Sequence, residues 1–372
     1  MKAIRAAIYL AAISRPFLFP DFCRAQQPTL SAPQFSEMDT EIASNKFPRI
    51  TGILVSRTNR LIYENYFGEG SREKLNDTRS VTKSLTALVV GRAIHDGQIS
   101  NVDARVMPFF KDMSPIANPD PIKDDMRVKD LLSMGSPLDA DDSIQDSPGN
   151  EDRMHEQQNW TRWAVDLPIR KDARRDSNGY EPFHYATVNA FLLGQTLARA
   201  TRRPVDAYLF ETLLKPLGIT RYEFQRSPKG EVMTGGGLAL RGVDLLKIGQ
   251  LVLDQGLYNG LQIIPASWVK ECLTVRHADT VGPGIGYGFL FWHMDFPLDE
   301  KTESGWFMAG NGGNIVVIFP GLKAVAVVTR TDYNGRGTAG ETIKLMTKFI
   351  LPALQGGESQ TAGLPKPKDL SH

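Results

Sequence analysis

The order of strand and helix patterns constrains the fold of this chain more than any other feature of the sequence. Two strand patterns near the start, 50–56 and 61–67, are separated by a short polar turn and predict a hairpin. Strand patterns return only late, at 315–319 and 324–329, and a further strand is expected to lead into Gly310. A chain with strands at both ends must join them, so we expect one sheet built from both termini.

The residues between these strands show mainly helical periodicity. Apolar positions recur at helical spacing in four segments here, and in a fifth after the last strand: 81–95, 190–200, 206–214, 244–253 and 339–351. The sequence therefore predicts an α+β fold, in which helices flank an antiparallel sheet. A mainly helical lobe at roughly residues 100–230 is inserted into it, and the crevice between lobe and sheet suits a ligand.

The two ends of the chain are expected to lie outside this domain, which we place at residues 26–355. In residues 1–25, Lys2 and Arg5 precede a short apolar run, and Ala25 supplies a small residue near its end, which is typical of a signal peptide. Export to the periplasm follows from this interpretation, and a poorly ordered cytoplasmic N-terminus is the alternative. The run is too short to span a bilayer in the mature chain. Beyond Pro352 the chain is rich in Gly, Pro and Lys, so the tail at 356–372 is expected to be disordered.

Composition gives no reason to expect nucleic acid, a metal or a cofactor. The 43 Lys and Arg residues nearly cancel the 42 Asp and Glu residues, and no long run of like charge occurs. The two cysteines, Cys23 and Cys272, and six scattered histidines do not form a zinc pattern. The acidic segment 139–149 reads as a flexible loop, since it lacks the glycine and glutamate of a calcium loop.

The candidate nucleophile is Ser80, which opens the apolar helix and is followed three positions later by Lys83. At this spacing both side chains lie on one helix face, and the helix N-terminus favours a developing oxyanion. A serine hydroxyl is a weak nucleophile that needs a base, and a lysine can serve only where burial disfavours its charged form. The alternative is that Ser80 caps the helix and Lys83 is solvated. A second match, Ser71 with Lys74, lies in a polar loop.

The segment around Tyr185 closely resembles the tyrosine box of class C β-lactamase-like enzymes. It reads Phe-His-Tyr-Ala-Thr-Val-Asn at 183–189 and is followed by Phe-Leu-Leu-Gly at 191–194. Further stretches match the same family in order: Lys-Pro-Leu-Gly at 215–218, Gly-Gly-Gly-Leu at 235–238, Gly-Tyr-Gly at 286–288, and Ala-Gly-Asn-Gly-Gly-Asn at 309–314. The resemblance implies a β-lactamase/transpeptidase-like fold and a serine hydrolase in which Tyr185 shares the proton transfers with Lys83.

The resemblance also implies a substrate-binding edge. The glycine-rich segment that begins at Gly310 would let a substrate carbonyl lie close to a strand, with Asn311 nearby. One oxyanion donor would be the N–H of the serine, and the second is expected from Met308 or Ala309. Other predicted substrate contacts are Thr187 and Asn189, although helix capping explains Asn189 equally well.

Two departures from the family pattern limit the substrate prediction. Thr187 stands where the family has Asn, and the edge-strand Lys-Thr-Gly or His-x-Gly is missing. Counting back from Pro320, residues 305–307 (Gly-Trp-Phe) would take its place, while 301–303 (Lys-Thr-Glu) comes too early. β-Lactamase activity is therefore doubtful, and a less charged ester or amide suits the edge better.

The sequence leaves two functions open. The first is a hydrolase that forms an acyl-enzyme on Ser80 and cleaves a small-molecule or peptide-like ester or amide. The second is a non-hydrolytic penicillin-binding-like sensor or scaffold with the same fold. A Ser-His-Asp triad through His184 is disfavoured because no Gly-x-Ser-x-Gly surrounds Ser80. The oligomeric state is not readable.

Overall fold

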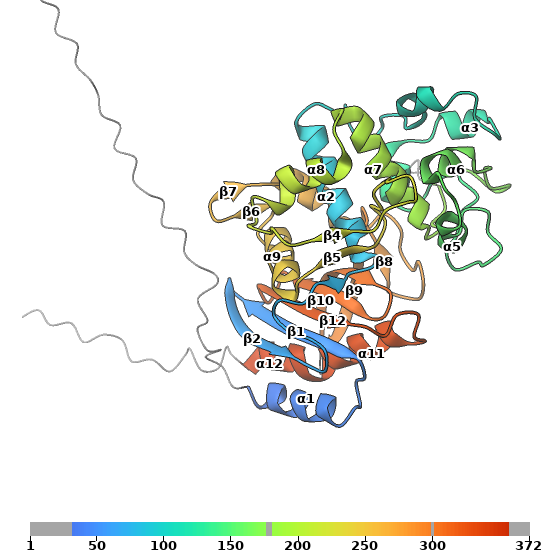
Figure 1. Cartoon of the computed structure of the whole chain (residues 1–372). Helices are drawn as coiled ribbons and strands as arrows, with labels where there is room; N and C mark the ends of the chain where they lie inside the picture. Colours follow the sequence, from blue (N-terminus) through green and yellow to red (C-terminus); the bar gives the residue numbers. More distant parts are fainter. Residues whose placement is uncertain (1–31, 176–180, 299–300, 357–372) are drawn as a thin grey trace, which may run out of the picture.

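A seven-stranded antiparallel sheet forms the centre of the molecule (Figure 1). The computed structural model describes residues 32–175, 181–298 and 301–356. In spatial order the strands are β2 (Arg60–Tyr66), β1 (Ile50–Arg57), β12 (Ala324–Arg330), β11 (Asn314–Phe319), β10 (Lys301–Gly310), β9 (Trp292–Leu298) and β8 (Gly286–Tyr287). The first hairpin therefore pairs with the last strand, which confirms the predicted sheet from both termini. The predicted signal peptide at 1–25 and the tail beyond Gly356 lie outside the described residues.

Both faces of this sheet are covered. In the pairing of β1 with β12, Ile53 lies opposite Val328 and Leu54 opposite Val327. Because side chains alternate along a strand, Ile53 and Val328 enter one core while Leu54 and Val327 enter the other. Central strands buried on both sides read as continuous apolar runs, which explains why these strands were visible in the sequence.

Helices from the two chain ends cover one face. These are α1 (Pro33–Ala43), α11 (Thr338–Leu345), the π-helical turn η3 (Met346–Ile350) and α12 (Leu351–Gly356). The last described helix, α12, ends at Gly356, close to the predicted domain boundary at residue 355. Leu351 and Leu354 bury their side chains beneath the sheet. Helix α1 was not among the helices predicted from the sequence.

The helical lobe covers the opposite face. Its two helices nearest the sheet are α2 (Val81–His95) and α9 (Gly242–Leu253). The rest of the lobe and its connections are η1 (Met107–Met113), α3 (Pro121–Asp124), α4 (Val128–Leu132), α5 (Glu151–His155), α6 (Trp160–Asp166), α7 (Thr187–Thr201), α8 (Val205–Leu209), η2 (Phe210–Leu214) and α10 (Ala266–Cys272). Three short strands, β3 (Asn76–Asp77), β5 (Leu238–Leu240) and β4 (Glu223–Phe224), form a second sheet, and β6 (Leu257–Tyr258) pairs with β7 (Leu261–Gln262). Within the described ranges, no helix has the length and apolar character that crossing a bilayer requires.

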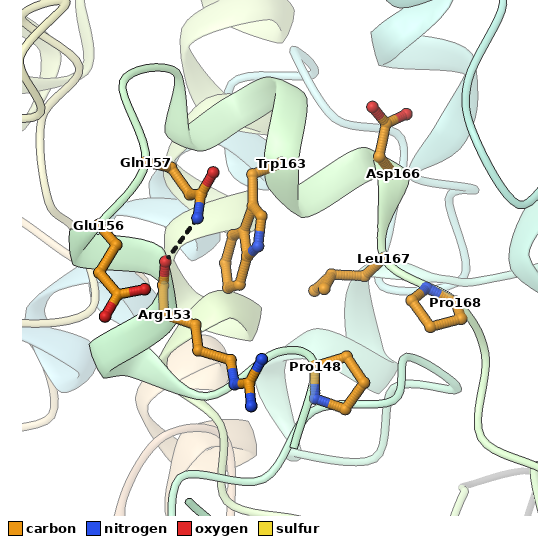
Figure 2. A pocket seen from close by; sticks show the side chains of 8 residues that line it. All are labelled: Pro148, Arg153, Glu156, Gln157, Trp163, Asp166, Leu167 and Pro168. Carbon is orange, nitrogen blue, oxygen red and sulfur yellow. Dashed lines mark hydrogen bonds between the residues drawn. The ribbon is translucent and has the colours of Figure 1, made fainter. Parts of the chain in front are cut away.

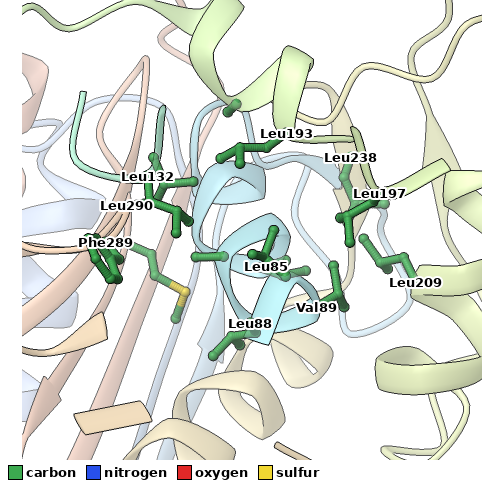
Figure 3. Packing of buried hydrophobic residues seen from close by; sticks show 14 of the residues in the cluster. Leu85, Leu88, Val89, Leu132, Leu193, Leu197, Leu209, Leu238, Phe289 and Leu290 are labelled. Atoms are coloured by element: carbon green, nitrogen blue, oxygen red, sulfur yellow. The ribbon is translucent and has the colours of Figure 1, made fainter. Parts of the chain in front are cut away.

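Helix α2 is buried on almost every side. Leu85, Leu88 and Val89 project from it among leucines of neighbouring elements, including Leu193 and Leu238 (Figure 3). Burying each such side chain contributes about 1.5–3 kcal/mol, so this packing fixes α2 firmly in the lobe. The few polar side chains of α2 then need partners of their own inside the protein, and those partners define the candidate site.

Candidate active site

Ser80 lies at the start of α2, directly after a turn in which one residue, Arg79, has an unusual backbone conformation. Arg79 has φ +51°, in the left-handed region that a side chain makes costly by about 1–2 kcal/mol. Asp77 accepts a 2.9 Å hydrogen bond from the Arg79 N–H, and the Arg79 guanidinium lies 4.2 Å from the centre of the Tyr333 ring. The hydroxyl of Ser80 makes no capping hydrogen bond to the helix, so the capping interpretation was wrong.

Lys83 is buried, with 1% of its surface exposed, and its amine contacts three different elements. It donates hydrogen bonds to Ser80 Oγ at 2.9 Å, to Thr187 Oγ1 at 2.9 Å and to the Gly235 carbonyl at 2.6 Å. The alternative of a solvated Lys83 was therefore also wrong. A buried amine is tolerated only where its hydrogen bonds are satisfied, and these three acceptors satisfy it. The second match, Ser71 with Lys74, lies in the irregular segment before β3, where Lys74 pairs with Glu69.

Tyr185 lies beside this amine, just before α7. The centre of its ring is 5.0 Å from Lys83 Nζ. The ring is half-buried and stacks on Trp292, with 5.5 Å between ring centres. Ser80, Lys83 and Tyr185, which are far apart in the sequence, therefore lie together in the structure.

An aromatic wall extends from Tyr185 along one side of the site. Tyr287 meets Trp292 edge-on at 4.6 Å between ring centres, and Phe183 meets Tyr287 at 5.2 Å. Complete burial raises the pKa of the Tyr287 hydroxyl well above its ordinary value. This wall keeps one side of the site apolar, where electrostatic interactions are stronger than in water.

A segment that was read as a flexible loop holds the tyrosine segment in place. The Asp142 N–H donates to the Tyr185 carbonyl at 2.8 Å, and its carboxylate accepts from the Thr187 N–H at 2.7 Å and the Glu151 N–H at 3.0 Å. The Asn150 side chain donates to the Ile144 carbonyl at 3.1 Å, which orders the loop. The segment is irregular, as predicted, but its acidic composition did not reveal these local hydrogen bonds.

The end of β10 lies against the turn before Ser80. A Cβ added to Gly310 would lie 2.2 Å from the Thr78 carbonyl oxygen, so only glycine fits this contact. The last pair of β10 with β9 is Phe307 with Trp292, and beyond it β10 pairs only with β11. Since successive N–H groups point to opposite edges of a strand, either Met308 or Ala309 directs its N–H to the open edge.

The structure corrects the prediction of which β10 residues replace the missing edge-strand Lys-Thr-Gly or His-x-Gly. The sequence count put residues 305–307 there, but Gly305 packs against Phe296 and Phe319, in the core on the far side of the sheet. The residue of β10 that lies against the turn before Ser80 is Gly310. The count failed because it assumed a fixed distance from Pro320 rather than a contact with the Ser80 turn.

The remaining predicted site residues lie close by, in different environments. Thr187 is buried, and its hydroxyl contacts Lys83. Asn189 is also buried and donates to Met134 Sδ at 3.4 Å. Asn311 is exposed and accepts a hydrogen bond from the Asn334 N–H. Met308 is buried, while Ala309 and Gly310 are partly exposed. Contact of these residues with a substrate stays a prediction.

His184 and the potential metal ligands show other arrangements. His184 Nδ1 lies 3.3 Å from an Asp141 carboxylate oxygen, so it has a partner other than Ser80. Across the part of the chain that the structure describes, no three His, Cys, Asp or Glu side chains gather as metal ligands would. Cys272 is buried, and burial raises the pKa of its thiol.

A separate hollow lies on the helical lobe between α5, α6 and the preceding loop (Figure 2). Trp163 and Leu167 form its apolar part, and Arg153 and Glu156 lie at its rim. Ser80, Lys83 and Tyr185 are not among its lining residues, so we give it no part in the chemistry of the site.

Comparison with known proteins agrees with this geometry. The Beta-lactamase family model matches residues 49–345, which include every element described around Ser80. The chain belongs to the β-lactamase family. This confirms the resemblance inferred from the tyrosine segment and the β-lactamase/transpeptidase-like fold.

Individual relatives of this β-lactamase-family chain are more distant. It is 25% identical over 271 residues to the 6-aminohexanoate-dimer hydrolase of Paenarthrobacter ureafaciens, covering 70% of this chain and 65% of that relative. A Bacillus anthracis structure described as a candidate 6-aminohexanoate-dimer hydrolase has a TM-score of 0.70 and 17% identity, covering 88% and 83% of the two chains. A D-stereospecific amidohydrolase from Streptomyces has a TM-score of 0.64 and 16% identity, covering 84% and 98%. These two structures show a shared fold.

Proposed function

We propose that this chain is a serine hydrolase that cleaves an ester or amide through an acyl-enzyme on Ser80. The observation that carries the proposal is the Lys83 amine, 2.9 Å from Ser80 Oγ and 5.0 Å from the centre of the Tyr185 ring. A buried amine and a phenol beside one hydroxyl are the groups that a serine nucleophile needs. In this proposal the Tyr185 phenol accepts the Ser80 proton as a general base.

The reaction then follows in two balanced steps. Ser80 Oγ bonds to the substrate carbonyl carbon, its proton passes to the Lys83–Tyr185 pair, and the same pair protonates the leaving amine or alcohol as its bond breaks. A water molecule next attacks the acyl carbon, gives a proton to the pair, and the carboxylic acid leaves as Ser80 regains its proton. General acid–base catalysis of this kind contributes about 10²–10⁴ in rate.

Two N–H groups are suited to stabilise the oxyanion. Among the described residues, the Ser80 N–H donates no hydrogen bond, and it lies at the N-terminus of α2. The second donor in this proposal is the N–H of Met308 or Ala309 that faces the open edge of β10. Removing one such donor typically lowers kcat by about 10²–10³.

The aromatic wall and the residues at the edge support a weakly charged substrate. Trp292 and Tyr185 offer apolar surface, and the part of β10 beside Ser80 carries no cationic side chain. A β-lactam carboxylate would therefore lack the cation that the family supplies from this strand. The relative named 6-aminohexanoate-dimer hydrolase supports an amide substrate, and the match spans 65% of that protein.

Labelling with a fluorophosphonate tests the nucleophile. We expect a single adduct on Ser80, located by peptide mass spectrometry, and loss of labelling in Ser80→Ala. Turnover is measured on p-nitrophenyl esters, linear ω-amino-acid amides, D-amino-acid amides and a chromogenic cephalosporin. A native protein that stays unlabelled and hydrolyses none of these would refute the proposal. A stable penicillin adduct without turnover would identify a sensor instead.

A further inference from the structure

The carboxylate of Asp142 lies behind the candidate site, on the far side of Thr187 from Lys83. Its two oxygens accept hydrogen bonds from the Thr187 and Glu151 N–H groups, while its own N–H donates to the Tyr185 carbonyl. One residue thus bonds to both sides of the Tyr185-Ala186-Thr187 segment. Thr187 is the first residue of α7, whose Ala186 N-cap provides no side-chain acceptor, so Asp142 supplies this helix cap from another loop.

Thr187 joins the Asp142 carboxylate to the Lys83 amine, because its N–H donates to Asp142 at 2.7 Å and its hydroxyl lies 2.9 Å from Lys83 Nζ. Burial raises the pKa of Asp142, whereas the positive charge of Lys83 and the hydrogen bond from the Thr187 N–H oppose that rise. An ammonium has only donors, so the Thr187 hydroxyl accepts from it. The Gly235 carbonyl can also only accept, and it lies 2.6 Å from Lys83 Nζ. Two of the amine's directions are then assigned, and the third faces Ser80 Oγ.

We propose that Asp142 is a positioning residue for the Lys83 amine, which it orients through Thr187. Its importance for catalysis rests on the proposed hydrolase function. An ammonium held in this way donates to Ser80 Oγ and leaves the neighbouring Tyr185 phenol as the base. Thr187, which stands where the family has Asn, is then the link between the carboxylate and the amine.

The charges around Asp142 determine the sign of the effect. The negative charge of Glu151 on α5 opposes ionisation of Asp142, whereas Lys83 on α2 favours it. The other titratable groups next to it are Asp141 in its own loop, and His184 and Tyr185 in the segment before α7. An ionised Asp142 favours the ammonium of Lys83, so removing its charge must make Lys83 lose its proton at lower pH.

The test follows the ¹³Cε resonance of Lys83 with pH in protein labelled with [¹³C]lysine, assigned by its loss in Lys83→Arg. In Asp142→Asn we expect the transition of this resonance to move to lower pH by about one unit or more. Asp146→Asn is the matched control, because Asp146 lies in the same loop with its side chain 99% exposed. The control should leave the transition unchanged.

Two further variants keep the test decisive if Asp142→Asn folds poorly. Thr187→Val removes the hydroxyl but keeps the N–H that donates to Asp142, so it should move the transition in the same direction. Thr187→Ser keeps the hydroxyl and should restore the wild-type transition. An unmoved Lys83 transition in both Asp142→Asn and Thr187→Val would overturn the proposal, even if both variants were less active.

Kinetics provide a second measurement that separates this proposal from the proposed function. In Asp142→Asn, kcat on an activated ester should fall by about tenfold or more while KM changes little, since the amine is misplaced but the substrate surface is intact. The Lys83 transition could move as expected in Asp142→Asn while the wild type neither reacts with the fluorophosphonate nor hydrolyses a substrate. That result would reject the hydrolase function and keep the positioning role. A fall in kcat with an unmoved resonance would reject the positioning role alone.

Discussion

Polar side chains enter the buried part of the site only where another element supplies a partner. Lys83, Thr187 and Asp142 come from three separate segments and are connected by hydrogen bonds, from the Lys83 amine to the Thr187 hydroxyl and from the Thr187 N–H to the Asp142 carboxylate. Networks of this kind are stable only when each member is satisfied, because an unpaired polar group in low dielectric is costly. Replacing one of these residues would therefore leave its hydrogen-bond partner unsatisfied.

Replacing Tyr185 by Phe tests the proton transfer without removing the ring. We expect kcat to fall by about 10²–10⁴ because the phenol is lost, while KM changes by no more than a few-fold, since the stack on Trp292 remains. Steady-state kinetics on a p-nitrophenyl ester measure both constants. Tyr222→Phe is the control, because Tyr222 packs on Phe210 in the helical lobe. A Tyr185→Phe enzyme within threefold of wild-type kcat would exclude the phenol as a proton carrier.

Individual site residues were predictable to different degrees. Ser80 and Lys83 could be paired from sequence because helical spacing alone puts them on one face. Tyr185 needed a family resemblance, since nothing in its spacing links it to Ser80. Asp142 gave no signal at all, because its contacts depend on how the loop folds back onto Thr187.

At the scale of elements, the strands and helices with the clearest apolar patterns were the ones visible in the sequence. The hairpin β1–β2 and helix α2 match their predicted ranges to within two residues. Strand β9 was missed because it lies toward the sheet edge, alternates weakly between exposed and buried residues, and contains Pro297. Such a strand is determined by its pairing with β10 rather than by its own composition.

The contact of α2 with α10 provides a test of packing at this scale. A Cβ added to Gly91 would lie 2.0 Å from the Trp268 ring, whose Nε1 donates to the Ala87 carbonyl at 2.9 Å. Gly91→Ala must push the ring away, so we expect the free energy of unfolding to fall by about 1–3 kcal/mol. Urea denaturation monitored by circular dichroism measures this change.

Gly340→Ala is the matched control for this prediction. Gly340 also lies inside a helix, α11, but a Cβ there would meet no heavy atom within 4 Å. Alanine should then be neutral or raise the free energy of unfolding by about 0.5–1 kcal/mol, because glycine is the poorer helix former. Equal effects at the two positions would show that the Trp268 contact does not limit α2.

At the scale of the whole molecule, the two ends of the described chain meet around one buried arginine. Arg330, at the end of β12, is fully buried and donates to the Pro48 carbonyl at 3.0 Å, the Thr338 carbonyl at 3.1 Å and a Glu341 carboxylate oxygen at 2.7 Å. These partners lie before β1 and in α11. Arg330 therefore joins the first strand of the sheet to the helix that covers it.

The same region reaches the candidate nucleophile. The loop after Arg330 carries Tyr333, whose hydroxyl donates to the Asp77 carbonyl at 3.2 Å and whose ring lies against Arg79, the residue before Ser80. The loop that follows the last strand of the sheet therefore packs against the turn before Ser80. The order of the strand patterns predicted that both termini contribute to one sheet. A single arginine at the end of a strand pattern gave no indication that Arg330 connects them.

Arg330→Met tests whether this closure stabilises the molecule. The substitution keeps an unbranched apolar stem but removes the donor to the Pro48 carbonyl and to the Glu341 carboxylate, while the Thr338 carbonyl keeps the Thr342 hydroxyl as a donor. An acceptor left without its donor costs about 1–3 kcal/mol. We therefore expect the free energy of unfolding to fall by about 1–3 kcal/mol, measured as a lower urea midpoint with an unchanged slope. Arg336→Met, at an exposed position in the same loop, should stay within about 0.5 kcal/mol of wild type. If the two variants unfolded at the same urea concentration, Arg330 would not be the residue that holds the termini together, and the β1–β12 pairing alone would have to account for the closure of the sheet.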